Sequence, residues 1–232
     1  MKKILSFIIL AFGFVGLANA QQQVTLGTTH PYNVVAVAGY TYTWTVDVVG
    51  TNTDVSAVTG NSISIDWNQA AGNYNITVFA TETATTCISE TETISVEVLG
   101  ASSVLFAAVD NATTCSDLDG NVDGGGASGG SSSFSVQFTD GLAPYDLVYR
   151  LLDPTDTPIG ADVTLTDVTA ATTITVANQF INGGITSVDY KVVLVSAITD
   201  DGAAVLVDAD VAKNTRIITV LPKPTITGGI IF

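Results

Sequence analysis

Basic residues are scarce in this chain. Seven Lys and Arg residues stand against 22 Asp and Glu, and the formal net charge is −15. Such an acidic surface repels phosphate backbones and the anionic faces of membranes, so we exclude nucleic acid as a partner. The charge suits Ca²⁺ or basic partners, although solubility alone accounts for it in many exported proteins.

Histidine is represented only by His30. A zinc site built on histidines would need a second one, which the chain lacks. A Ser-His-Asp triad would have to use His30, yet the sequence contains no nucleophile-elbow phrase. Paired carboxylates of the glycosidase type remain open, but acidic residues such as Asp153, Asp200 and Glu92 fall in expected turns or on exposed strand faces. We therefore expect no enzymatic activity, no catalytic residue and a structural or surface role for His30.

A long apolar run occurs only at the N-terminus. Lys2 and Lys3 precede the run at 4–17, and the small-x-small phrase Ala-Asn-Ala follows at 18–20. This order is typical of a cleaved signal peptide, with a retained anchor as the alternative. We expect residues 1–20 to be removed and the rest to be exported, and losing the two lysines changes the formal charge from −15 to −17. No later segment reaches the roughly 20 apolar residues of a membrane helix, so we expect no integral membrane protein.

Apolar and polar residues alternate along much of the remaining chain. The stretches 40–46, 61–67 and 134–139 each show a period of two, which predicts half-buried β-strands. Turn residues at regular spacing between such strands favour a sandwich. We therefore expect an all-β fold with two tandem Ig-like antiparallel β-sandwich modules, at 21–99 and 100–221, and a C-terminal tail at 222–232.

Trp44 and Trp67 are the two tryptophans of the chain, and each lies in phase with apolar neighbours. Core packing is therefore expected for both. The alternative is that they are exposed platforms on which sugar rings stack, as in a carbohydrate-binding module.

Three phrases of the first module carry a family resemblance: Tyr-x-Trp at 42–44, Gly-Asn-Ser-Ile-Ser-Ile-Asp-Trp at 60–67 and Gly-x-Tyr at 72–74. They resemble the Ig-like and PKD-like repeats of exported surface proteins from Bacteroidota. The resemblance implies a binding or structural module and places Tyr74 at a tyrosine corner, where the hydroxyl bonds to the backbone. The phrase at 134–145 resembles a second repeat of such proteins, in which Gly-x-x-Pro-Tyr links two strands. The intersheet cysteine pair of antibody domains is absent.

Cysteine is limited to Cys87 and Cys115. In an oxidising compartment such a pair more often forms a disulfide than two thiols. The bridge would stabilise the chain by roughly 3–4 kcal/mol through loop closure. The alternative is that each cysteine lies unpaired in its own loop.

A loop rich in Asp and Gly offers hard oxygen ligands at alternate positions, as Ca²⁺ loops do. It resembles the start of an EF-hand-type or thrombospondin-type Ca²⁺ loop. It departs from the pattern at Val122, where Gly is required, and at Ser128, where a bidentate Glu is required. The alternative is a solvated acidic loop. The candidate Ca²⁺ ligands are Asp117, Asp119, Asn121 and Asp123.

The C-terminus reads Pro-Lys-Pro-Thr-Ile-Thr-Gly-Gly-Ile-Ile-Phe over 222–232 and is apolar, unlike most chain ends. Such a β-prone segment can pair with an exposed sheet edge in its own molecule or in a neighbour. It also resembles the Pro-x-Pro-x-Thr tails of some exported Bacteroidota proteins, which implies a sorting or docking signal for type IX secretion. The alternative is a last strand that completes the second module. The candidate docking or sorting residues are Pro222, Pro224, Thr225, Ile230, Ile231 and Phe232.

These features together favour a non-enzymatic structural or adhesion protein of the cell surface or the extracellular space, with the periplasm as a further location. It would be a filament or matrix subunit that is joined or docked through its C-terminal strand. Its partners would be other surface proteins or copies of itself. The alternative is a carbohydrate- or Ca²⁺-binding module, whose partner would be a surface glycan. We expect no required cofactor, with Ca²⁺ as the one candidate.

Overall fold

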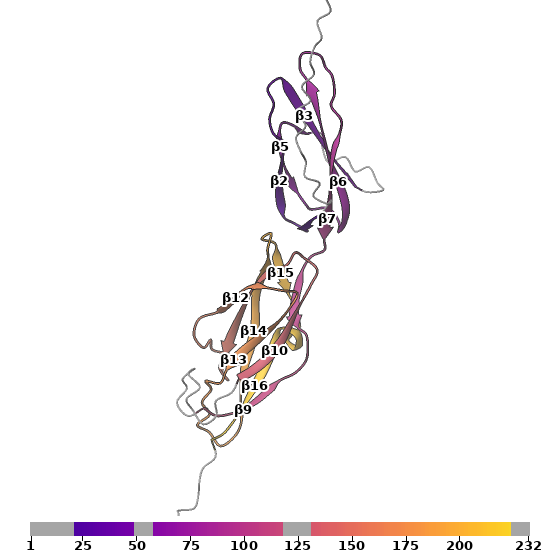
Figure 1. Cartoon of the computed structure of the whole chain (residues 1–232). Helices are drawn as coiled ribbons and strands as arrows, with labels where there is room; N and C mark the ends of the chain where they lie inside the picture. Colours follow the sequence, from indigo (N-terminus) through magenta and orange to yellow (C-terminus); the bar gives the residue numbers. More distant parts are fainter. Residues whose placement is uncertain (1–20, 49–57, 118–130, 224–232) are drawn as a thin grey trace, which may run out of the picture. The chain divides into compact units, whose positions relative to one another are not determined.

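The computed structural model of this chain describes residues 21–48, 58–117 and 131–223. These residues form strands β1 to β16 and one short helix, α1 (Val211–Asn214), shown in Figure 1, so the predicted all-β fold is confirmed. The chain divides into two compact units. The first consists of Met1–Gln22, Val37–Gly60 and Asn73–Glu97, and the second of Gln23–Ala36, Asn61–Gly72 and Val98–Phe232. The module boundary expected near residue 100 stays a prediction.

The first unit is built on strand β3 (Tyr40–Val48), which contains the alternating aromatic residues. Strand β3 pairs antiparallel with β6 (Gly72–Glu82) on one side and with the short β4 (Val58–Thr59) on the other. The strand order of this sheet is β1-β7-β6-β3-β4. Most of β7 (Glu92–Leu99) belongs to the first unit, whereas β1 (Gln22–Thr25) belongs to it only at Gln22. Tyr42 and Trp44 are buried, as the period of two predicts.

Strands β2 (Thr29–Asn33) and β5 (Ser62–Asp66) form an antiparallel pair in the second unit. Pro31 lies inside β2, where its missing N–H is tolerated because β2 pairs on one side only among the residues that the structure describes. Trp67 follows β5 and meets the ring of Tyr32 edge to face, with the centroids 6.4 Å apart. Its indole N–H donates to the Tyr32 hydroxyl at 3.2 Å.

Strands β8 to β16 of the second unit are joined by backbone hydrogen bonds. One series runs β12-β11-β14-β15-β8-β10-β13, and β16 pairs with β14 and with β9. Most pairs are antiparallel, but β15 with β8 and β16 with β9 run parallel. The bounds are β8 (Ser103–Phe106), β9 (Ala112–Cys115), β10 (Ser131–Thr139), β11 (Tyr145–Leu152), β12 (Val163–Val168), β13 (Ala171–Ala177), β14 (Val188–Thr199), β15 (Ala204–Val207) and β16 (Thr215–Leu221).

Alternate residues of these strands fill the core of the second unit. Phe134 and Phe138 are buried, which confirms the strand predicted at 134–139. The ring of Tyr145 stacks on Phe138 with centroids 4.1 Å apart, and its hydroxyl donates to the Asp140 carbonyl at 2.7 Å. This is a tyrosine corner at the Gly-x-x-Pro-Tyr phrase. Tyr74 is also buried, and the corner expected there stays a prediction.

Candidate functional site

Strand β13 lies at one edge of the sheet in the second unit. It pairs with β10 from Ser131↔Ala177 to Gln137↔Ala171, and no strand of the described residues pairs with its other side. Its sequence, Ala-Thr-Thr-Ile-Thr-Val-Ala, contains neither charge nor proline and is rich in β-branched residues. Native proteins usually shield a sheet edge with charges, prolines or bulges. Within the part of the chain that the structure describes, the outer edge of β13 is therefore available for strand pairing.

The register shows which backbone groups of β13 face the open side. The Phe138 N–H donates to the Ala170 carbonyl at 2.9 Å. Hydrogen-bonded and non-hydrogen-bonded pairs alternate along an antiparallel ladder, so Ile174 exchanges its backbone hydrogen bonds with β10. The N–H and C=O groups of Thr173 and Thr175 then point to the open side. This spacing of donors and acceptors is what an added strand requires.

Edge strand β12, at the other end of the series, is shielded in ways that β13 is not. Its register with β11 shifts between Tyr145 and Leu147, and Asp167 has a φ of +56°, so its ladder is irregular. Asp162, just before β12, accepts hydrogen bonds from Arg150 at 2.6 and 2.8 Å. These bonds lower the pKa of Asp162, which keeps the carboxylate charged beside the edge. The two ends of the series therefore differ in their readiness to pair.

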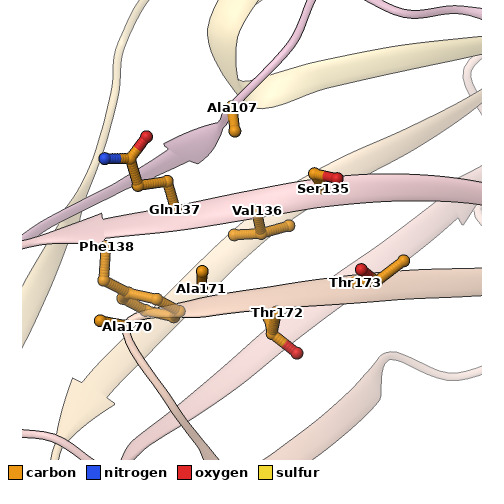
Figure 2. Close-up of a pocket in the computed structure, with 9 residues that line it drawn as sticks. All are labelled: Ala107, Ser135, Val136, Gln137, Phe138, Ala170, Ala171, Thr172 and Thr173. Carbon is orange, nitrogen blue, oxygen red and sulfur yellow. The ribbon is translucent and has the colours of Figure 1, made fainter.

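A shallow hollow of about 410 Å³ lies over β10 and the start of β13. Figure 2 shows the small side chains around this space, among them Ala107, Ser135 and Ala171. None of its lining residues carries a charge: Ala107, Ser135, Val136, Gln137, Phe138, Ala170, Ala171, Thr172 and Thr173. In so acidic a chain, an uncharged surface beside an open edge suits an uncharged, apolar partner.

A second hollow, of about 630 Å³, has cations on its lining, but these are already engaged. The Arg216 guanidinium lies 4.7 Å from the centre of the Phe106 ring and donates to the carbonyls of Ala212, Thr215 and Phe106. Burial lowers the pKa of Arg216. Lys191 forms an ion pair with Asp156 at 2.5 Å. We therefore assign these cations to the fold rather than to a ligand.

His30 lies in a polar cluster of the second unit. Its Nε2 is 3.0 Å from the Thr28 hydroxyl and 3.7 Å from the Asp201 carboxylate. A catalytic triad uses the two ring nitrogens for two different partners, whereas both contacts here involve the same nitrogen. The Thr28 hydroxyl also donates to the Thr25 carbonyl at 2.7 Å. The contacts of His30 thus tie it to Thr28 and Asp201, and the structural or surface role expected for it stays a prediction.

Asp201 is the enclosed acid of this cluster, with 3% of its side chain exposed. It accepts hydrogen bonds from the Thr25 N–H at 2.6 Å and from the Thr199 hydroxyl. Burial raises the pKa of Asp201, but these hydrogen bonds and the nearby His30 lower it by more, so the net pKa lies below the usual value. No local sequence pattern predicts this cluster, because Thr25 and Asp201 are 176 positions apart.

The two tryptophans are 2% and 0% exposed, for Trp44 and Trp67 respectively. The indole N–H of Trp44 donates to the Gly60 carbonyl at 2.7 Å, and that of Trp67 donates to the Tyr32 hydroxyl. Core packing is therefore confirmed. The alternative of exposed sugar-stacking platforms is wrong, because both rings are buried.

Cys87 and Cys115 are exposed free thiols in the structure. The disulfide expected between them is not formed here and stays a prediction.

Of the four candidate Ca²⁺ ligands, Asp117 is described. It is 3% exposed, and its N–H donates to the Phe180 carbonyl at 2.8 Å. Asp119, Asn121 and Asp123 lie outside the described residues. Across 21–48, 58–117 and 131–223, no three His, Cys, Asp or Glu side chains are grouped as a metal site would require. Ca²⁺ binding by this loop stays a prediction.

The tail is described as far as Pro222 and Lys223. Its other candidate residues, Pro224, Thr225, Ile230, Ile231 and Phe232, lie outside the described residues. Among the residues that are described, no helix has the length and apolar character needed to cross a membrane.

Comparison with known proteins shows similarity at the level of structure only. No family model and no curated protein matches the chain. Fibronectin(III)-like modules of CbhA from Clostridium thermocellum match with 13% identity and a TM-score of 0.37, covering 90% of this chain and 92% of theirs. Domains FN1–FN3 of chicken CNTN1 match with 10% identity and a TM-score of 0.40, covering 88% and 63%. Three N-terminal domains of the Hoc outer capsid protein of bacteriophage RB49 match with 16% identity and a TM-score of 0.38, covering 86% and 55%.

Proposed function

We propose that this chain is a non-enzymatic structural or adhesion protein, exported to the cell surface or beyond, and that it associates with its partners by strand addition. The partners are other surface proteins or copies of the chain itself, as in a filament or a matrix. Export is supported by the signal-peptide pattern of residues 1–20.

The observation that carries this proposal is the open, uncharged edge of β13. Thr173 and Thr175 direct their backbone groups away from β10, and no strand of the described residues meets them. A partner strand would form main-chain hydrogen bonds there without having to desolvate a charge on β13, because the strand has none. Strand β12, at the other end of the series, is shielded, so the exposed edge of β13 is not a feature of every edge strand in this unit.

The mechanism in this proposal is mechanical. The sandwich supplies a stiff frame, because its core is closed by large side chains such as Phe106, Phe134 and Phe180. The open edge supplies the joint, and the apolar segment 222–232 supplies a strand of matching character. A sorting role of the same segment in type IX secretion is compatible with this, since a segment can direct export first and pair later.

The test has two parts, carried out on cells and on the purified chain beginning at Gln21. Protease added to whole cells should digest the protein, which places it at the surface. Sedimentation velocity should show species larger than a monomer that grow with concentration. A protein protected in whole cells, with a single monomeric species at all concentrations, would contradict the proposal.

A further inference from the structure

We propose that the strand that occupies the β13 edge is residues 224–232 of a second copy of this chain, so that copies join head to tail. This inference rests on the proposed function. It adds the strand that is donated, 224–232, and the edge that accepts it, β13. Three features support it: the pattern of the tail, the direction in which β16 leaves the fold, and the place of the hollow along β13.

The tail matches the edge in length and in character. At about 3.3 Å per residue, residues 224–232 extend over roughly 30 Å and β13 over roughly 23 Å, so the tail can cover the whole edge. The tail segment carries no charged side chain. Because side chains of a strand alternate between faces, Ile226, Ile230 and Phe232 fall on one face, with Gly228 between them. One face of the added strand is therefore apolar.

We take the donor from a second copy because a tail that follows β16 would have to reverse its direction to lie antiparallel along its own β13. Strands β13 and β16 end at the same end of the second unit. Just after β13, Asn178 donates to the Cys115 carbonyl at 3.1 Å and Asn182 to the Val220 carbonyl at 2.9 Å, and Leu221 pairs with Cys115.

To lie along its own β13, the tail would have to reverse within a few residues after Leu221. The sequence there opposes a reversal. Pro222 and Pro224 each fix φ near −65° and hold the preceding residue, Leu221 or Lys223, in an extended conformation. An immediate reversal at Leu221–Lys223 is therefore disfavoured, which favours the edge of a second copy as the acceptor.

The hollow selects the antiparallel orientation of the added strand. An antiparallel tail that begins beside Ala177 brings Ile230, Ile231 and Phe232 to the start of β13. The hollow of about 410 Å³ lies at that end, where Ala170 and Ala171 leave space beside Phe138. Large side chains of an added strand reach diagonal neighbours on the same face of a sheet. The apolar end of the tail thus meets the uncharged hollow.

The test separates donor from acceptor with three variants of the chain beginning at Gln21. Deletion of 222–232 removes the donor. The substitution Thr173→Pro removes one outward N–H of the acceptor, and the fold tolerates it because that N–H makes no bond to β10. The control Thr173→Val keeps the N–H and the shape of the side chain. Circular dichroism and a thermal melt verify that each variant is folded.

Sedimentation velocity gives the readout. We expect the unaltered chain and Thr173→Val to form concentration-dependent oligomers, and the deletion and Thr173→Pro variants to be monomers. Mixing the two monomeric variants should give a 1:1 dimer and nothing larger, because one provides only the edge and the other only the tail. That complementation is specific to pairing between copies.

Two results would overturn the inference. If the deletion abolishes assembly while Thr173→Pro assembles like Thr173→Val, the tail docks elsewhere, and the proposed function survives without this acceptor. If the two monomeric variants do not form a dimer when mixed, the tail of one copy does not pair with the edge of another. Failure of the proposed function is a different result, namely a monomeric unaltered chain that is not at the cell surface.

Discussion

At the scale of single residues, the aromatic side chains hold the fold together. Trp67 is fully buried, its ring packs edge to face on Tyr32, and its N–H donates to the Tyr32 hydroxyl. We expect Trp67→Ala to lower the free energy of unfolding by about 3–5 kcal/mol, as for other buried aromatic residues. Urea denaturation measures this change. The control is Ile185→Ala, at a side chain that is 95% exposed, and it should change stability by less than about 0.5 kcal/mol. Equal effects of both substitutions would contradict the assigned burial.

A second effect of a single residue is the pH dependence of stability that Asp201 produces. Burial raises its pKa, but the hydrogen bonds from Thr199 and Thr25 and the proximity of His30 lower it below the usual value. Because the folded-state pKa is lower than the unfolded one of about 3.9, the carboxylate stabilises the fold above that pH. This contribution is lost as the pH falls below about 4 and through the folded-state pKa.

We expect Asp201→Asn to destabilise the protein at pH 7 by roughly 1.5–3 kcal/mol, the usual range for hydrogen bonds to a charged group. The variant should also lose part of the stability difference between pH 7 and pH 3. Urea midpoints across this range measure both effects. Asp200→Asn, at the exposed neighbouring residue, is the matched control. A variant with the same midpoints as the unaltered chain would show that the cluster does not contribute.

At the scale of elements, the open edge of β13 predicts alternating amide exchange. In the variant that lacks 222–232, the N–H groups of Thr173 and Thr175 should exchange with solvent at least about tenfold faster than that of Ile174, which bonds to β10. When the chain that retains 222–232 has assembled, the N–H groups of Thr173 and Thr175 should both become protected from exchange. Residue-resolved hydrogen exchange followed by NMR measures this. Uniform protection along β13 without the tail would mean that the edge is already paired.

The positions of the strands could be predicted from the sequence, but the place of β13 at the edge of a sheet could not. The period of two in 134–139 and the positions of Trp44 and Trp67 follow from local sequence, because alternation alone decides which face of a strand is buried. Whether β13 is central or peripheral depends on strand pairings between segments far apart in sequence, which alternation does not encode. One signal was available: 171–177 is uncharged and free of proline. The same limit applies to the contact between Thr25 and Asp201.

At the scale of the whole molecule, the charge sets the conditions for assembly. Copies that have lost residues 1–20 carry a formal charge of −17 each, because Lys2 and Lys3 are removed from a total of −15. These charges repel one another over the Debye length, which is about 10 Å at 0.1 M salt and about 3 Å at 1 M. The proposed joint between β13 and 224–232 has no charged side chain on either strand. Salt therefore screens the repulsion and leaves the joint intact.

Assembly should accordingly strengthen with ionic strength. We expect the association constant of the chain beginning at Gln21 to rise several-fold between roughly 0.05 and 0.5 M NaCl, as measured by sedimentation velocity over a series of concentrations. The variant without 222–232 is the control and should stay monomeric at both salt concentrations, because screening alone supplies no strand. An interface built on ion pairs would respond in the opposite direction, since salt weakens attraction between opposite charges. A falling association constant would therefore mean that charged contacts, and not the neutral edge of β13, hold the copies together.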